Sequence, residues 1–112
     1  MSIAERSNKS PIACTRELDV FSPEQRERHE TVGQQLESAV QEVQELSDGY
    51  ALRYSAETVS VLTLAEFITF ERLCCPFLHF GLEVECEEGP VWLRLTGDEG
   101  VKEFMRAEFG IS

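Results

Sequence analysis

The side chains best suited to chemistry in this 112-residue chain are its four thiols, Cys14, Cys74, Cys75 and Cys86. Cys74 and Cys75 are neighbours, and a disulfide between adjacent residues is badly strained relative to ordinary disulfide geometry. The sequence has no C-x-x-C spacing, so it predicts neither a zinc ribbon nor a thioredoxin-type motif. We therefore expect reduced thiols, which can serve as metal ligands, redox groups or core side chains.

A carboxylate and an imidazole accompany the paired thiols. On a helical wheel, Glu71 falls in the middle of an apolar face, between Phe67 and Ile68. It precedes the two thiols by three and four residues, which is the spacing of neighbours on a helix. A carboxylate in that position must be paired, protonated or bound to a cation, because burial of an isolated charge is costly. His29 lies in the same way on the apolar face of an earlier predicted helix.

These residue types predict a thiol-based metal-binding or metal-sensing domain. Thiolate, imidazole and carboxylate are ligands of zinc and of other borderline-to-soft ions. Adjacent residues in a regular helix diverge by about 100°, but a proline after the second thiol disfavours the helical conformation there and lets that thiol turn back. Zinc is the expected ion, and mercury or copper(I) would suit a thiol-dominated subset. The predicted primary ligands are Cys74 and Cys75, completed by Glu71 and either His29 or Cys14.

Two other functions remain open. In a thiol redox protein, Cys74 or Cys75 would be the reactive thiol and Cys14 the resolving one. A helix C-terminus and the nearby Glu71 would both raise the pKa of such a thiol, which argues against this alternative. In a non-enzymatic, dimeric interaction domain, the cysteines would only pack. The sequence leaves open whether the chain is an enzyme, and it contains no Walker, G-x-S-x-G or H-E-x-x-H motif.

Simpler structural roles are also available to several of these residues. Cys86 lies on the apolar side of a predicted strand and is expected in the core. His29 could be a core histidine bonded to a backbone carbonyl, and Glu71 could pair with Arg53 or with His29. His79 is expected at the exposed start of a strand. Trp92 would either pack under a helix or lie in a partner interface.

The elements that position these residues can be read from patterns along the chain. Ser22-Pro23-Glu24-Gln25 carries a helix cap, and an apolar stripe extends that helix to about Leu46. Alternation predicts a short strand over 50–54. A second helix is predicted from about 56 to 74, and Pro76 ends it. A hairpin of strands over 78–86 and 91–95 follows, and a last helix ends at Gly110.

This order predicts an α+β two-layer sandwich, in which three helices pack on a three- to four-stranded, mainly antiparallel sheet. Residues 1–10 are expected to be a disordered tail, and 11–112 a single domain, with 11–20 available as an edge strand. A sheet this small leaves an edge open, which favours a homodimer.

Charge and composition exclude several classes of partner. Ten Lys and Arg stand against 21 Asp and Glu, so the formal net charge is −11. This acidity disfavours nucleic acid and anionic membrane surfaces, both of which need clustered Lys and Arg. No apolar stretch approaches the roughly 20 residues that cross a bilayer, and the first residues lack a secretory h-region. We therefore expect a cytoplasmic protein.

The segment Phe70-Glu71-Arg72-Leu73-Cys74-Cys75-Pro76-Phe77, with Gly89-Pro90-Val91-Trp92-Leu93 further on, resembles a group of small, mostly uncharacterised bacterial proteins. These share an E-R-x-C-C-P-F core. The likeness extends back through Glu27-Arg28-His29 to Cys14 and covers about residues 11–110. It implies a stand-alone domain whose signature positions are Cys14, His29, Glu71, Cys74 and Cys75. It implies no particular reaction.

Overall fold

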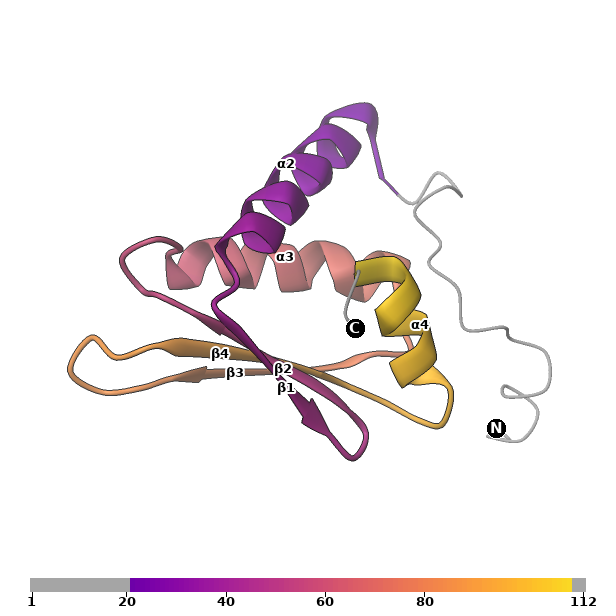
Figure 1. The fold of residues 1–112 in the computed structure, drawn as a ribbon. Helices are drawn as coiled ribbons and strands as arrows, with labels where there is room; N and C mark the ends of the chain where they lie inside the picture. Colours follow the sequence, from indigo (N-terminus) through magenta and orange to yellow (C-terminus); the bar gives the residue numbers. More distant parts are fainter. Residues whose placement is uncertain (1–20, 110–112) are drawn as a thin grey trace.

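The computed structural model describes residues 21–109, which form three helices and four strands (Figure 1). In chain order these are α2 (Pro23–Ala39), β1 (Glu42–Leu46), β2 (Gly49–Tyr54), α3 (Val61–Cys74), β3 (His79–Val84), β4 (Val91–Thr96) and α4 (Val101–Phe109). The expected tail at 1–10, the optional strand at 11–20, Cys14 and Gly110 lie outside the described residues.

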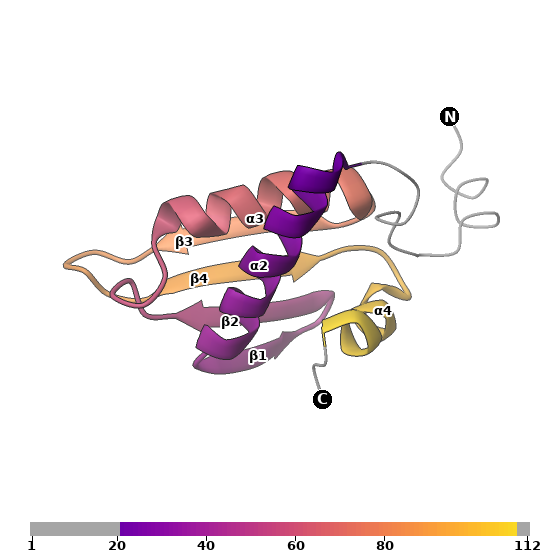
Figure 2. The same ribbon diagram turned by 90° about the horizontal axis from the view of Figure 1, so that it is seen from above.

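The strands form one antiparallel sheet in the order β1-β2-β4-β3. The helices lie on one face of this sheet. α2 crosses above it beside α3, and α4 lies by the β1–β2 hairpin, near the start of β2 (Figures 1 and 2). The predicted α+β sandwich of three helices on an antiparallel sheet is therefore confirmed.

Alternation along β4 separates the two faces of the sheet. Val91, Leu93 and Leu95 are buried, whereas the intervening residues point to the other face. Trp92 is one of these, so the first of its two predicted places, under a helix, is wrong. Its place in a partner interface stays a prediction. Its indole Nε1 donates a hydrogen bond to Glu85 Oε2 at 2.9 Å.

The first helix is shorter than predicted. Its start is as expected, because the Ser22 hydroxyl accepts from Gln25 N–H and the Gln25 side chain accepts from Ser22 N–H. However, Val40 is extended (φ −65°, ψ 132°), and residues 42–46 form strand β1 instead of further helix. β1 pairs with β2 from Glu42↔Arg53 to Leu46↔Gly49. This pairing outweighs the helical stripe, and Ser47-Asp48 is a hairpin turn rather than a helix stop.

The second helix begins later than predicted and ends where expected. Ser60 caps α3 by accepting from Thr63 N–H at 3.1 Å, so residues 56–60 precede the helix. Cys75 leaves the helical conformation (φ −131°, ψ 67°), as its position before a proline predicts. Its N–H still donates to the carbonyl of Glu71 at 2.7 Å, which fixes the backbone at the helix end.

The predicted hairpin is present as β3 and β4. His79 is exposed at the start of β3, as expected. The prediction that Cys86 belongs to the core is wrong, because β3 ends at Val84 and Cys86 lies exposed in the turn beyond it. Beyond Val84, the last paired residue of β3, strand alternation no longer determines burial.

Candidate metal centre

Packing of α2 against α3 brings together two groups that are 42 residues apart in the chain. His29 Nε2 lies 2.5 Å from Glu71 Oε2. Both side chains are buried, with exposed fractions of 4% for His29 and 2% for Glu71. Two polar groups at the centre of a helix–helix junction are tolerated there because each is the other's partner.

Aromatic rings enclose the imidazole on several sides. The Phe67 ring stacks on His29 with a centroid distance of 6.2 Å and an interplanar angle of 17°. Phe21 and Phe70 approach the same imidazole at 5.2 Å and 5.5 Å. This apolar wall lowers the local dielectric and strengthens the interaction of His29 with the carboxylate.

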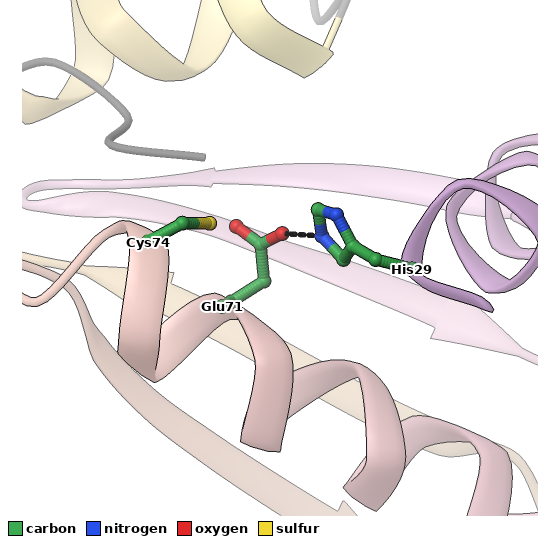
Figure 3. Close-up of side chains that lie close together, drawn as sticks. All are labelled: His29, Glu71 and Cys74. Carbon is green, nitrogen blue, oxygen red and sulfur yellow. Dashed lines mark hydrogen bonds and ion pairs between the residues drawn. The ribbon is translucent and has the colours of Figure 1, made fainter. Parts of the chain in front are cut away.

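Cys74 brings a third donor to the pair. Its side chain is fully buried. One ligand atom each from His29, Glu71 and Cys74 lies within 4.8 Å of the other two. Figure 3 shows the carboxylate of Glu71 between the other two groups, with the Cys74 sulfur pointing toward one oxygen and the imidazole bonded to the other. The three residues therefore form a buried cluster that could hold a metal ion.

Cys75 adds a second sulfur beside the cluster. Its Sγ lies 3.6 Å from Cys74 Sγ, well beyond the roughly 2.05 Å of a disulfide bond. Two thiolates bound to one zinc at about 2.3 Å would be about 3.8 Å apart in a tetrahedral site. A linear arrangement with similar bonds would need about 4.6 Å. The sulfur separation is thus close to tetrahedral coordination by both thiols and too short for linear coordination.

The imidazole and carboxylate would have to separate to share an ion. With bonds of about 2.0–2.1 Å to a tetrahedral zinc, their ligand atoms would lie about 3.3 Å apart. The present 2.5 Å is a direct hydrogen bond. An entering ion would therefore open this hydrogen bond by about 0.8 Å and displace its proton.

The structure brings three of the five predicted ligands together and places a fourth beside them. His29, Glu71 and Cys74 form the cluster, Cys75 adjoins it through Cys74, and Cys14 lies outside the described residues. Of the two partners predicted for Glu71, His29 is the one that contacts it in the structure. Arg53 instead lies 3.7 Å from Glu42. The Nε2 atom of His29 therefore faces a carboxylate and not a backbone carbonyl.

Sequence patterns did not indicate a cavity of about 870 Å³, whose lining includes the His29–Glu71 pair. It lies between α2 and the sheet over β1 and β2, and its wall includes His29, Glu71, Tyr50 and Tyr54. Burial raises the pKa of Tyr54 to about 12. The alternation of Tyr50, Leu52 and Tyr54 was the available signal, but it indicated only a strand.

No family model, curated protein or solved structure matches this chain. Among the described residues, no helix combines the length and apolarity needed to cross a membrane. Function is therefore inferred from the donor groups and their geometry.

Proposed function

We propose that this protein binds a divalent metal ion, with zinc as the physiological choice, at His29, Glu71 and Cys74. The observation that carries the proposal is the convergence of three buried donors of different types within 4.8 Å. Imidazole, carboxylate and thiolate together are a ligand set that zinc accepts. In contrast, a buried thiolate beside a carboxylate would be destabilised without a cation between them.

The second thiol is the leading candidate for a fourth ligand. The separation of 3.6 Å between Cys74 Sγ and Cys75 Sγ supports coordination of one tetrahedral ion by both. Cys14 is the alternative, because it precedes Phe21 by seven residues and an extended chain of that length reaches about 24 Å. The Phe21 ring packs on His29, so the chain enters the described fold beside the cluster.

The arrangement disfavours a redox-active thiol. In a nucleophilic cysteine site the imidazole contacts the sulfur and removes its proton. Here the carboxylate of Glu71 stands between the imidazole and Cys74 (Figure 3). A neighbouring carboxylate stabilises the protonated thiol, so Cys74 is better suited to binding a cation than to attacking a disulfide or peroxide.

The ligands of the proposed site come from two different helices, which suggests how the protein would sense a metal ion. One ligand, His29, belongs to α2, whereas Glu71 and Cys74 belong to α3. An ion bound to all three would tie these helices together, and its loss would leave the direct His29–Glu71 contact and the packing of His29 on Phe67 and Phe70. We propose that metal occupancy is transmitted through the position of α2.

Native mass spectrometry of the full chain, purified without chelator and then titrated with zinc, tests the proposal. We expect one zinc per chain in the wild type. Cys74→Ser should lose the ion, whereas Cys86→Ser should retain it, because Cys86 is an exposed thiol in the β3–β4 turn. Cys75→Ser and Cys14→Ser identify the fourth ligand.

A wild-type chain that stays metal-free with excess zinc under reducing conditions would overturn the proposal. Equal loss of zinc in Cys74→Ser and Cys86→Ser would do the same. The spectrum also reports the mass of the assembly, and thereby tests the homodimer, which stays a prediction.

A further inference from the structure

The cavity beside the candidate metal centre has features of a ligand site in its own right. At about 870 Å³ it lies in the size range of small-molecule pockets. Its floor is apolar, formed by Leu36, Val40, Leu52 and Leu95. On the edge strand β1, Val43 lines the cavity from the helix side of the sheet and is 42% exposed.

Two buried tyrosines line this space. Tyr50 and Tyr54 alternate along β2, line the cavity, and are each only 2% exposed. Within residues 21–109, neither hydroxyl has a hydrogen-bond partner. Among the same residues, no sealed side-chain nitrogen or oxygen is left without a partner. Both tyrosines line the open space of the cavity. Buried tyrosines usually find a partner for the hydroxyl, and here a ligand can supply it.

The formally charged side chains that line the cavity are all carboxylates. Glu30 and Glu37 on α2 and Glu108 on α4 line it together with Glu45 and Glu71. Of the described residues, no Lys or Arg lines it. Lys102 lies nearby, where it donates to Glu45 and its Nζ sits 5.6 Å from the centre of the Tyr50 ring. A cation is thus already placed against this aromatic and acidic wall, which excludes anions and attracts ammonium groups.

We propose that the cavity binds a primary ammonium ion carried on a small apolar skeleton. The apolar body packs on the leucine and valine floor, and the ammonium N–H groups donate to a tyrosine hydroxyl and to carboxylates. Phenolic and carboxylate oxygens are the acceptors that such a cation requires. This site needs no metal, so it stands or fails independently of the proposed zinc centre.

Gly33 offers a way to close the cavity without disturbing the fold. It lies in the middle of α2 and lines the cavity, and a Cβ built there meets no atom within 4 Å. Gly33→Leu therefore projects a side chain into the open space. Gly33→Ala is the matched control, because it adds one methyl group and favours the helix by about 0.5–1 kcal/mol.

In the experiment, the isotope-labelled, chelator-treated full chain is titrated with small-molecule probes. Binding is measured from the change in the amide chemical shifts. The probes share one skeleton: 2-phenylethylammonium, neutral 2-phenylethanol and anionic phenylacetate. We expect 2-phenylethylammonium to shift the amides of Gly33 and Tyr54 saturably with a dissociation constant below about 1 mM. It should bind at least about ten-fold more tightly than the other two probes.

The variants locate the ligand. Gly33→Leu should weaken binding by more than about ten-fold, and Gly33→Ala by less than about two-fold. Tyr54→Phe, which removes one acceptor, should weaken it by about five-fold. Glu37→Gln should weaken binding of the ammonium probe and leave the affinity for 2-phenylethanol unchanged. This variant tests the location of the ligand even if Gly33→Leu does not fold.

Three results would overturn the proposal. The first is the absence of any saturable shift with the ammonium probe at about 10 mM. The second is phenylacetate or 2-phenylethanol binding as tightly as the ammonium. The third is unchanged ammonium binding in both Gly33→Leu and Glu37→Gln. Because zinc is absent throughout, none of these results bears on the metal proposal.

Discussion

Tyr54 shows how one buried side chain sets a property of the whole fold. Its side chain is buried and lines the cavity, and burial leaves the phenolate form poorly solvated. Burial therefore raises the pKa of Tyr54 from 10.0 to about 12. In the unfolded chain the same phenol would ionise near its ordinary pKa.

This difference predicts a loss of stability at alkaline pH. Between pH 10 and 12 the unfolded state releases the Tyr54 proton while the folded state keeps it, so the free energy of unfolding falls as pH rises. The contribution is complete below pH 10, and about 2 kcal/mol is lost by pH 12. Urea unfolding at several pH values measures it. Tyr54→Phe should show a shallower decline, and an identical decline in both proteins would refute the prediction.

At the scale of elements, the junction of α2 and α3 has an inner and an outer polar contact. His29 and Glu71 meet inside it, whereas Arg28 and Glu66 meet on its surface through two hydrogen bonds of 2.8 and 2.9 Å. Arg28 lowers the pKa of the Glu66 carboxyl. Solvent screens the outer pair, so the inner one governs the energetics of the junction.

Removal of one inner partner should therefore destabilise the fold more than removal of both. His29→Ala leaves a buried carboxylate without its imidazole and should cost about 3–5 kcal/mol. The double variant His29→Ala/Glu71→Leu removes the charge as well, and should recover part of that loss. Thermal or urea unfolding of metal-free protein compares them, with Arg28→Ala as the surface control. A double variant less stable than His29→Ala would contradict this account.

At the scale of the whole molecule, the proposed metal links the helices above a small sheet. Binding to the folded chain alone stabilises it by an amount that grows with the ion concentration. Zinc at 100 times its dissociation constant would add about 2.7 kcal/mol, which raises the melting temperature of a domain of this size by about 10 °C.

Calorimetry with and without zinc checks this expectation. Chelator should reverse the rise, and Cys74→Ser should show none. The rise should shrink as the pH falls, because Cys74 must lose its proton and His29 must be neutral to bind the ion. An equal rise in Cys74→Ser would place the zinc elsewhere on this acidic chain.

The sequence by itself determined those features that depend on local order. Three such features depend on residues only a few positions apart in the sequence: the Ser22–Gln25 cap, the end of α3 before Pro76 and the β3–β4 hairpin. All three are present as predicted. The sequence also singles out His29 and Glu71, because a His or Glu on an apolar helical face violates the pattern around it. Such a violation is visible without any knowledge of the fold.

Only the tertiary structure decided what depends on distant partners. Residues 42–46 carry a helical stripe, yet they became strand β1 because β2 offers backbone partners across a tight turn. The pairing of His29 with Glu71 rather than Arg53 depends on how α2 crosses α3. The cavity depends on the gap between α2 and the sheet, which no local pattern encodes. Periodicity tells which side of an element is buried, but the partner that buries it is selected by the packing of the whole chain.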